Sequence, residues 1–165
     1  MEKTESKRLE EVGFTGFLSV RELRELKKMR RFSSTVPSTK GVYVILRLNE
    51  SKPKFLEKGT GGYFRGEDPN VPIAELKRNW VNGTSIMYIG KTGNLKQRIS
   101  AYIKFGEMKA VGHRGGRLIW QLADSDDLVV CWKPTAQVPR EVEKEMIQCF
   151  KYAHGNQRPF ANLTD

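Results

Sequence analysis

Three runs of the chain consist almost entirely of β-branched, aromatic and other hydrophobic residues, a density that favours buried strands. They cover Gly41–Leu48, Ser85–Gly90 and Leu128–Lys133. Turn-forming residues follow each run within a few positions. We therefore predict three strands.

Outside these runs, hydrophobic residues recur every three or four positions, which is the spacing along one face of a helix. Ser19 and Glu22 have the spacing of a capping box and predict a helix over Val20–Arg31. Asn94 can cap another helix, on which Arg98 stands at the edge of the hydrophobic stripe. Two more helices are predicted, from Pro72 to about Trp80 and from Arg140 to about Tyr152.

The remaining segments define the domain limits. Residues 1–12 alternate basic and acidic side chains without a hydrophobic region, so we expect a frayed arm and no secretory signal. We divide the chain into an N-terminal arm and helix, 1–40, and one domain, 41–165, with a loop-rich insertion at about 48–85. No hydrophobic run approaches the roughly 20 residues that cross a bilayer, and we expect a cytoplasmic protein without membrane contact.

Basic residues outnumber acidic ones by 29 to 19, which gives a net charge of +10, and their distribution is uneven. Between Lys91 and Gln121 there are seven basic residues and one acidic residue, a net charge of +6. Such a concentration lowers the cost of approaching a polyphosphate. A solvated lysine-rich surface has the same composition, so charge alone leaves both interpretations open. The candidate DNA-phosphate contacts in this stretch are Lys104, Lys109, His113, Arg114 and Arg117.

The two cysteines, Cys131 and Cys149, both stand in hydrophobic patterns. We expect both to be buried free thiols in a reducing compartment. Two cysteines argue against a structural zinc site, which usually takes four Cys or His ligands at short spacing. Any bound metal must therefore be held by oxygen.

The helical phase of three glutamates singles out Glu143. Glu141 and Glu145 share one side of the last predicted helix, whereas Glu143 falls on the hydrophobic side with Met146 and Ile147. A carboxylate on that side is costly unless a cation or a donor meets it. The partner can be a nearby arginine in a salt bridge or an oxygen-ligated metal, and the phase alone does not decide between them.

Gly41-Val42-Tyr43 and Tyr88-Ile89-Gly90 resemble the paired signatures that give the GIY-YIG nucleases their name. The resemblance continues through Lys91, Arg98, an inward Glu143 and the segment Pro159–Asn162, and so spans most of the chain. It implies an α+β fold with a small three-stranded antiparallel sheet flanked by helices, here with an N-terminal helical extension. In compact family members the two signatures stand much closer together, which marks 48–85 as an insertion between strands one and two.

The resemblance also implies the activity of a divalent-metal-dependent DNA endonuclease, which hydrolyses phosphodiester bonds. Glu143 would hold one Mg²⁺ or Mn²⁺, because Mg²⁺ commonly uses only one or two protein carboxylates. Arg98 would contact the scissile phosphate through its fork of donors. DNA is the expected partner. One active site cuts one strand, so a dimer would be needed to cut both strands together, and the oligomeric state stays open.

Two tyrosines compete for the role of general base. Either Tyr43 or Tyr88 would accept the proton of the attacking water, assisted by Lys91, since a phenol with an ordinary pKa near ~10 must be perturbed to do so. The resemblance does not decide which tyrosine it is. Asn162 completes the implied set of catalytic residues.

Three further features are open to more than one interpretation. The loop Gly112–Arg117 can donate to phosphate from its backbone and side chains, with His113 in proton transfer, or be a simple turn. Tyr63–Arg65 and Lys77–Asn79 of the insertion are candidate contacts to a DNA groove. Trp80, Trp120 and Trp132 are more readily interpreted as core residues than as base-stacking platforms.

Two other functions are compatible with parts of the pattern. A non-cleaving nucleic-acid-binding module on the same fold would be favoured by loss of the site Tyr, Arg or Glu, and all three are present. A structural or protein-interaction domain would leave the basic stretch and the inward Glu143 unexplained.

Overall fold

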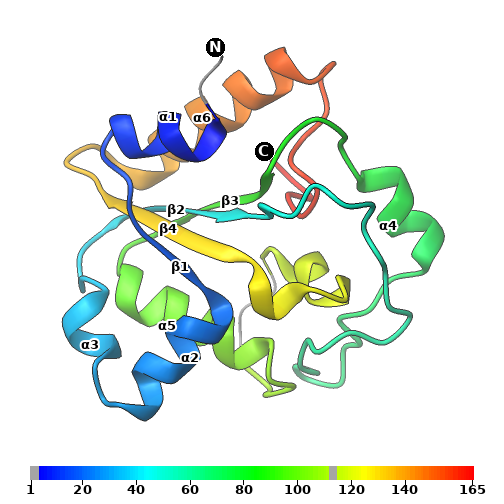
Figure 1. Ribbon diagram of the computed structural model, residues 1–165, viewed down its shortest axis with the longest axis horizontal. Helices are drawn as coiled ribbons and strands as arrows, with labels where there is room; N and C mark the ends of the chain where they lie inside the picture. Colours follow the sequence, from blue (N-terminus) through cyan, green and yellow to red (C-terminus); the bar gives the residue numbers. More distant parts are fainter. Residues whose placement is uncertain (1–3, 112–114) are drawn as a thin grey trace.

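The computed structural model describes residues 4–111 and 115–165. Within these residues the centre of the molecule is one antiparallel sheet in the strand order β1-β4-β2-β3 (Figure 1). The strands are β1 (Thr15–Ser19), β2 (Gly41–Leu46), β3 (Ile86–Thr92) and β4 (Val129–Pro134).

Helices cover both faces of the sheet (Figure 1). The last helix, α6, and the first, α1, lie on one face, and α2, α3 and α5 lie toward the other, with α4 beyond the end of the sheet. The helices are α1 (Glu5–Glu11), α2 (Val20–Lys28), α3 (Phe32–Thr35), α4 (Ile73–Asn79), α5 (Leu95–Phe105) and α6 (Pro139–Ala153), with short 3₁₀ helices η1 (Arg117–Gln121) and η2 (Ser125–Asp127).

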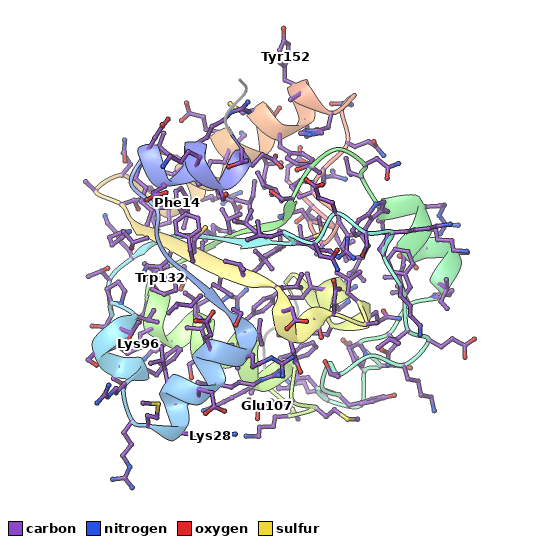
Figure 2. The ribbon with its side chains drawn as sticks, in the orientation of Figure 1. Phe14, Lys28, Lys96, Glu107, Trp132 and Tyr152 are labelled. Atoms are coloured by element: carbon purple, nitrogen blue, oxygen red, sulfur yellow. The ribbon has the colours of Figure 1, made fainter. Side chains whose placement is uncertain are left out.

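The sheet therefore separates two hydrophobic cores. Along β2, Val42 and Val44 belong to the core under α1 and α6, whereas Tyr43 and Ile45 belong to the core under α2 and α5. This is the alternation expected of a strand covered on both faces, which is why all of β2 is buried. Figure 2 shows the same division in Phe14, on the α6 side, and Trp132, on the other.

The prediction of three strands is wrong, because the sheet has a fourth strand, β1, paired with β4. The alternation of hydrophobic and polar residues in the sequence did not indicate β1. The register shifts between Gly16 and Leu18, and both Gly16 and Phe17 have positive φ, 94° and 54°. This bulge breaks the two-residue period on which strand prediction depends.

The expectation of a frayed arm over residues 1–12 is also wrong for the residues that the structure describes. Thr4 caps α1 by accepting from the Lys7 amide, and Leu9 is buried against the sheet. The Glu5 carboxylate accepts hydrogen bonds from the Ser85 amide and the Thr84 hydroxyl. Helix α1 is therefore fastened to the residues that lead into β3.

The insertion is fixed to the body of the protein by two buried polar side chains. Gln121 accepts from the Val71 amide and donates to the Leu56 and Val71 carbonyls. Arg47 donates to Asp124 at 2.8 Å and to the Asn49 and Ser51 carbonyls. These contacts hold the start of the insertion and Val71, two residues before α4, and Trp80 at the end of α4 packs on Phe160 of the C-terminal segment.

The two cysteines have different environments. Cys131 is buried in β4, and burial raises the pKa of its thiol to about 12, whereas Cys149 on α6 is exposed. The expectation that both are buried is therefore wrong for Cys149. Among the described residues, no helix is long and apolar enough to cross a membrane.

Candidate active site

Three tyrosines pack together in the core beneath α5. The rings of Tyr43 and Tyr88 lie with centroids 5.9 Å apart, and Tyr102 of α5 lies 6.1 Å and 6.0 Å from them. Gly90 pairs with Tyr43 across β2 and β3, and a Cβ on Gly90 would fall 2.4 Å from the Tyr43 ring. The glycine of Tyr88-Ile89-Gly90 is thus required by the close approach of the Tyr43 ring.

Arg98 connects this cluster to the surface. Its Nε donates to the Tyr43 hydroxyl oxygen at 3.1 Å, and its side chain is partly exposed. Within residues 4–111 and 115–165, its two terminal nitrogens have no hydrogen-bond partner. The asparagine cap of α5, where Asn94 accepts from the Gln97 amide, places Arg98 one turn into the helix as the sequence predicts.

Burial and charge oppose each other at the tyrosines. Burial raises the pKa of Tyr43, while the Arg98 guanidinium and hydrogen bonds from Arg98 and Tyr88 lower it in part. Burial also raises the pKa of Tyr88, and the neighbouring Tyr43 raises it further. Of the two phenols, Tyr43 is therefore the one whose ionised form has donors already aimed at it.

Glu143 lies across the edge of the sheet from this cluster, on α6. It is buried, as its helical phase predicts, and the Lys91 ammonium of β3 stands 3.6 Å from its Oε1. Burial raises the pKa of the Glu143 carboxyl, and Lys91 opposes this effect. The salt-bridge partner is thus a lysine of the second signature, not an arginine.

The tyrosine cluster and the Lys91–Glu143 pair lie at neighbouring residues of β3. Lys91 pairs with Val42 and Gly90 with Tyr43, so the two groups occupy adjacent positions on opposite faces of the edge strand β3. The charge of Glu143 raises the pKa of Tyr43, and that of Arg98 lowers the pKa of Glu143. The structure brings together Tyr43, Tyr88, Lys91, Arg98 and Glu143.

The donor set can accommodate a magnesium ion with a single protein ligand. Among the described residues, no cluster of three His, Cys, Asp or Glu side chains is present. Glu143 alone supplies a carboxylate, and its surroundings of Lys91, Arg98 and Arg140 favour an anionic partner beside it. A hard cation held by one carboxylate, with water and phosphate oxygens completing its shell, fits this arrangement.

Asn162 is bound to the backbone of β3. Its Oδ1 accepts from the Ile89 amide at 2.9 Å, and its Nδ2 donates to the Ile89 carbonyl at 2.9 Å. The Ala161 amide also donates to the Met87 carbonyl. Both polar groups of Asn162 are thus bound to the backbone of β3, where they hold the strand between Tyr88 and Gly90.

The glycine-rich loop ends against the tyrosine cluster. Tyr102 donates to the Gly116 carbonyl at 2.6 Å, and a Cβ on Gly116 would lie 3.0 Å from the Tyr88 ring. Arg117 then begins η1. His113 and Arg114, two of the predicted phosphate contacts, lie outside the described residues.

Two other predicted phosphate contacts lie apart from the site. Lys104 and Lys109 are exposed at the far end of α5 and beyond it, and Lys109 pairs with Glu107 at 3.7 Å. They are close enough to Lys27 of α2 to help burial lower the pKa of that lysine to about 8. Any phosphate that they bind is therefore not the one beside Arg98.

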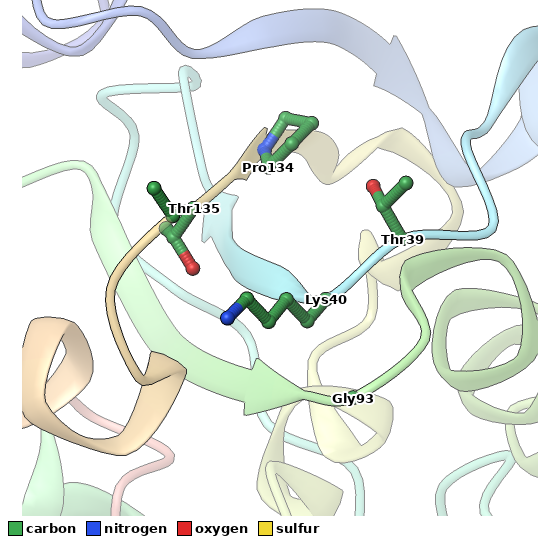
Figure 3. Close-up of a pocket in the computed structure, with 6 residues that line it drawn as sticks. Thr39, Lys40, Gly93, Pro134 and Thr135 are labelled. Carbon is green, nitrogen blue, oxygen red and sulfur yellow. The ribbon is translucent and has the colours of Figure 1, made fainter.

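A hollow at the ends of β2, β3 and β4 adjoins the site, and sequence reasoning did not single it out (Figure 3). Thr39, Lys40 and Gly93 line it together with Pro134 and Thr135. The Lys40 side chain lies across the hollow toward Thr135. The only signal for it in the sequence is that Lys40 directly precedes the first signature.

The chain matches no family model, no curated protein and no solved structure in comparisons with known proteins.

Proposed function

We propose that this protein is a DNA endonuclease of the GIY-YIG type that hydrolyses one phosphodiester bond with the help of one divalent cation. The observation that carries the proposal is that the Tyr43–Arg98 hydrogen bond and the Lys91–Glu143 ion pair involve neighbouring positions of the paired strands β2 and β3 and influence each other electrostatically. The two signatures predicted a shared site, and the strand register puts their residues at adjacent positions.

Arg98 is the group that contacts the phosphate. One of its nitrogens is held by Tyr43, so the guanidinium has a fixed direction, and the other two remain available within the described residues. Charge grows on the non-bridging oxygens as water attacks phosphorus, and a preoriented guanidinium stabilises it. Arg98 would thus stabilise the transition state more strongly than it stabilises the complex with uncleaved DNA.

Tyr43 is the better candidate for the group that accepts the proton of the attacking water. Its ionised oxygen would be stabilised by Arg98, whose Nε already donates to it, whereas no such hydrogen bond from a cation reaches Tyr88 within the described residues. Burial keeps both phenols protonated in the free protein at neutral pH. To act as the base, the tyrosine would therefore need its pKa lowered by a positive charge that joins the site together with the DNA.

Glu143 is the residue that would hold the cation. When bound, a magnesium ion supplies Lewis acidity beside the phosphate and helps the 3′ oxygen to leave. In the free protein, Lys91 partly balances the buried carboxylate. Nearly half of the Lys91 side chain is exposed, so Lys91 could also contact the incoming phosphate.

Cleavage assays test the proposal. The wild-type protein is incubated with supercoiled, linear, branched and single-stranded DNA in Mg²⁺ or Mn²⁺, and we expect strand scission of at least one substrate. Glu143→Gln should abolish cleavage and the stabilisation by Mg²⁺ in thermal melting. Glu145→Gln, an exposed neighbour on the same helix, should leave both unchanged.

The outcomes separate the functions. A wild-type protein that binds DNA and cuts none of these substrates with either metal would show a non-cleaving nucleic-acid-binding module. Loss of cleavage in Glu145→Gln but not in Glu143→Gln would remove Glu143 from the site. Protein without DNA affinity would contradict both nucleic-acid functions.

A further inference from the structure

A polar pocket lies between the insertion and the C-terminal segment. Its volume is about 210 Å³. Arg78 and Asn79 of α4 line it on one side, and Asn156, Gln157, Arg158 and Asn162 line it on the other. We refer to it as the polar pocket.

The polar pocket offers donors and positive charge. Arg78 is exposed and forms no hydrogen bond or ion pair with the described part of the chain. The amides of Asn79, Asn156 and Gln157 add uncharged donors to the same surface. Guanidinium groups and side-chain amides are the groups that most often contact DNA phosphates and base edges.

Arg158, the second arginine, has an anionic partner from the chain itself. Its Nε donates to Asp165 Oδ1 at 2.5 Å, and Lys151 donates to the other oxygen of the same carboxylate at 3.0 Å. These cations hold the pKa of Asp165 below its ordinary value. Asp165 therefore presents a charged oxygen pair to Arg158 in the way that a phosphate would.

Asn162 connects the polar pocket to the candidate active site. It lines the pocket, and it also forms two hydrogen bonds to Ile89, the residue between Tyr88 and Gly90. Asn162 thus links the lining of the pocket to the backbone of β3 between Tyr88 and Gly90.

We infer that the polar pocket binds the phosphate backbone of DNA beside the cleaved bond, through Arg78 and Arg158, and that Asp165 competes with the DNA for Arg158. This inference rests on the proposed function for its substrate. It gives the insertion a role, since α4 supplies Arg78, one of the two arginines of the site. It also predicts that removing one negative charge raises the affinity.

Binding measurements on a short fluorescent DNA duplex in EDTA test the inference without cleavage. Arg158→Ala and Arg78→Ala should each weaken binding by about tenfold at low salt. Each should also reduce the slope of log affinity against log salt by about 0.9, because each arginine neutralises one phosphate. Asp165→Asn should tighten binding by roughly threefold, the factor expected for freeing a partly exposed ion pair.

The chain contains a matched control in a second exposed Arg–Asp pair. Arg21 of α2 donates to Asp127 at 3.1 Å, near the opposite edge strand, β1. Arg21→Ala and Asp127→Asn change the net charge by the same amounts, and they should leave affinity and salt slope close to those of the wild type. In an Arg158→Ala background, Asp165→Asn should no longer tighten binding.

Results that overturn the inference differ from those that overturn the nuclease proposal. If Arg158→Ala and Asp165→Asn behave like the Arg21 and Asp127 variants while wild-type protein cuts DNA, the pocket inference fails alone. If the pocket variants change DNA affinity as expected but no substrate is cut, the pocket stands and the nuclease proposal fails. Equal effects of both Arg–Asp pairs would show only a response to net charge and would contradict the pocket.

Discussion

The Arg98 side chain joins a buried phenol to the partly exposed surface of the candidate site. Its Nε is committed to Tyr43 at 3.1 Å, and that bond sets the plane of the guanidinium. A lysine at this position would keep the charge but could not hold Tyr43 and meet a phosphate in two directions at once. A lysine substitution therefore tests whether the geometry of the Arg98 guanidinium matters in addition to its charge.

We expect Arg98→Lys to lower the single-turnover cleavage rate by about 10² or more, which is roughly 3 kcal/mol of transition-state stabilisation. The fold and most of the DNA affinity should be retained. Saturating enzyme isolates the chemical step, and thermal melting confirms folding. Arg21→Lys on α2 serves as the control, and a folded Arg98→Lys protein that cuts within about threefold of wild type would transfer the transition-state role to another group.

The buried carboxylate of Glu143 gives a prediction for stability. Burial raises its pKa in the folded protein above the ordinary 4.5, so folding disfavours the charged form. The contribution of Glu143 to stability is then complete below about pH 4.5 and is lost as pH rises through the higher folded value. Glu143→Gln should therefore melt at a higher temperature than wild type at neutral pH, and the difference should vanish near pH 4.

Thermal melting across this pH range checks the prediction. Glu145→Gln, on the exposed side of α6, should show no such pH-dependent difference. A Glu143→Gln protein that melts below the wild type at neutral pH would mean that the ion pair with Lys91 outweighs the cost of burial.

Among the helices and strands, those with a regular hydrophobic period could be predicted from the sequence. The two signature strands, the α5 helix with its Asn94 cap, and α6 all lie within a few residues of their predicted positions. The inward phase of Glu143 is confirmed for the same reason, because α6 is long enough to have a clear hydrophobic face. Hydrophobic periodicity was sufficient to place a helix or a strand wherever that periodicity was regular.

The elements that were missed depend on distant partners. Strand β1 contains a bulge and two positive φ angles, and its pairing with β4 compensates for them. Helix α1 buries only Leu9 and is held instead by the contact of Glu5 with residues 84 and 85. The backbone contact of Asn162 with Ile89 joins positions 73 residues apart, which no local pattern records.

On the scale of the whole molecule, positive charge is spread beyond the candidate site. Lys104 and Lys109 stand at the far end of α5, about 16 Å in length for its 11 residues, so they can reach phosphates some distance from the cleaved bond. When DNA binds such a surface, the basic side chains neutralise phosphates and the counterions of those phosphates are released into solution. We therefore expect duplex affinity to fall steeply as salt increases.

Replacing Lys104 or Lys109 by Gln should lower the salt slope by about 0.9 for each phosphate contact that is lost. Fluorescence anisotropy at several salt concentrations measures this slope. Lys28→Gln is the control, since Lys28 is exposed on α2, pairs with Glu25 and points away from the sheet (Figure 2). An affinity that does not change with salt would contradict an electrostatic DNA-binding surface and favour a protein-interaction domain.

Both margins of the sheet are blocked against growth from one molecule to the next. At β3, Ala161 and Asn162 occupy backbone groups of Met87 and Ile89 that another strand would need. At β1, the bulge at Gly16 and Phe17 twists the outer strand out of a regular ladder. Unblocked strands of this kind are where cross-molecular β-pairing and fibril formation begin. We therefore expect the segment that frames the polar pocket also to oppose association between molecules through β3.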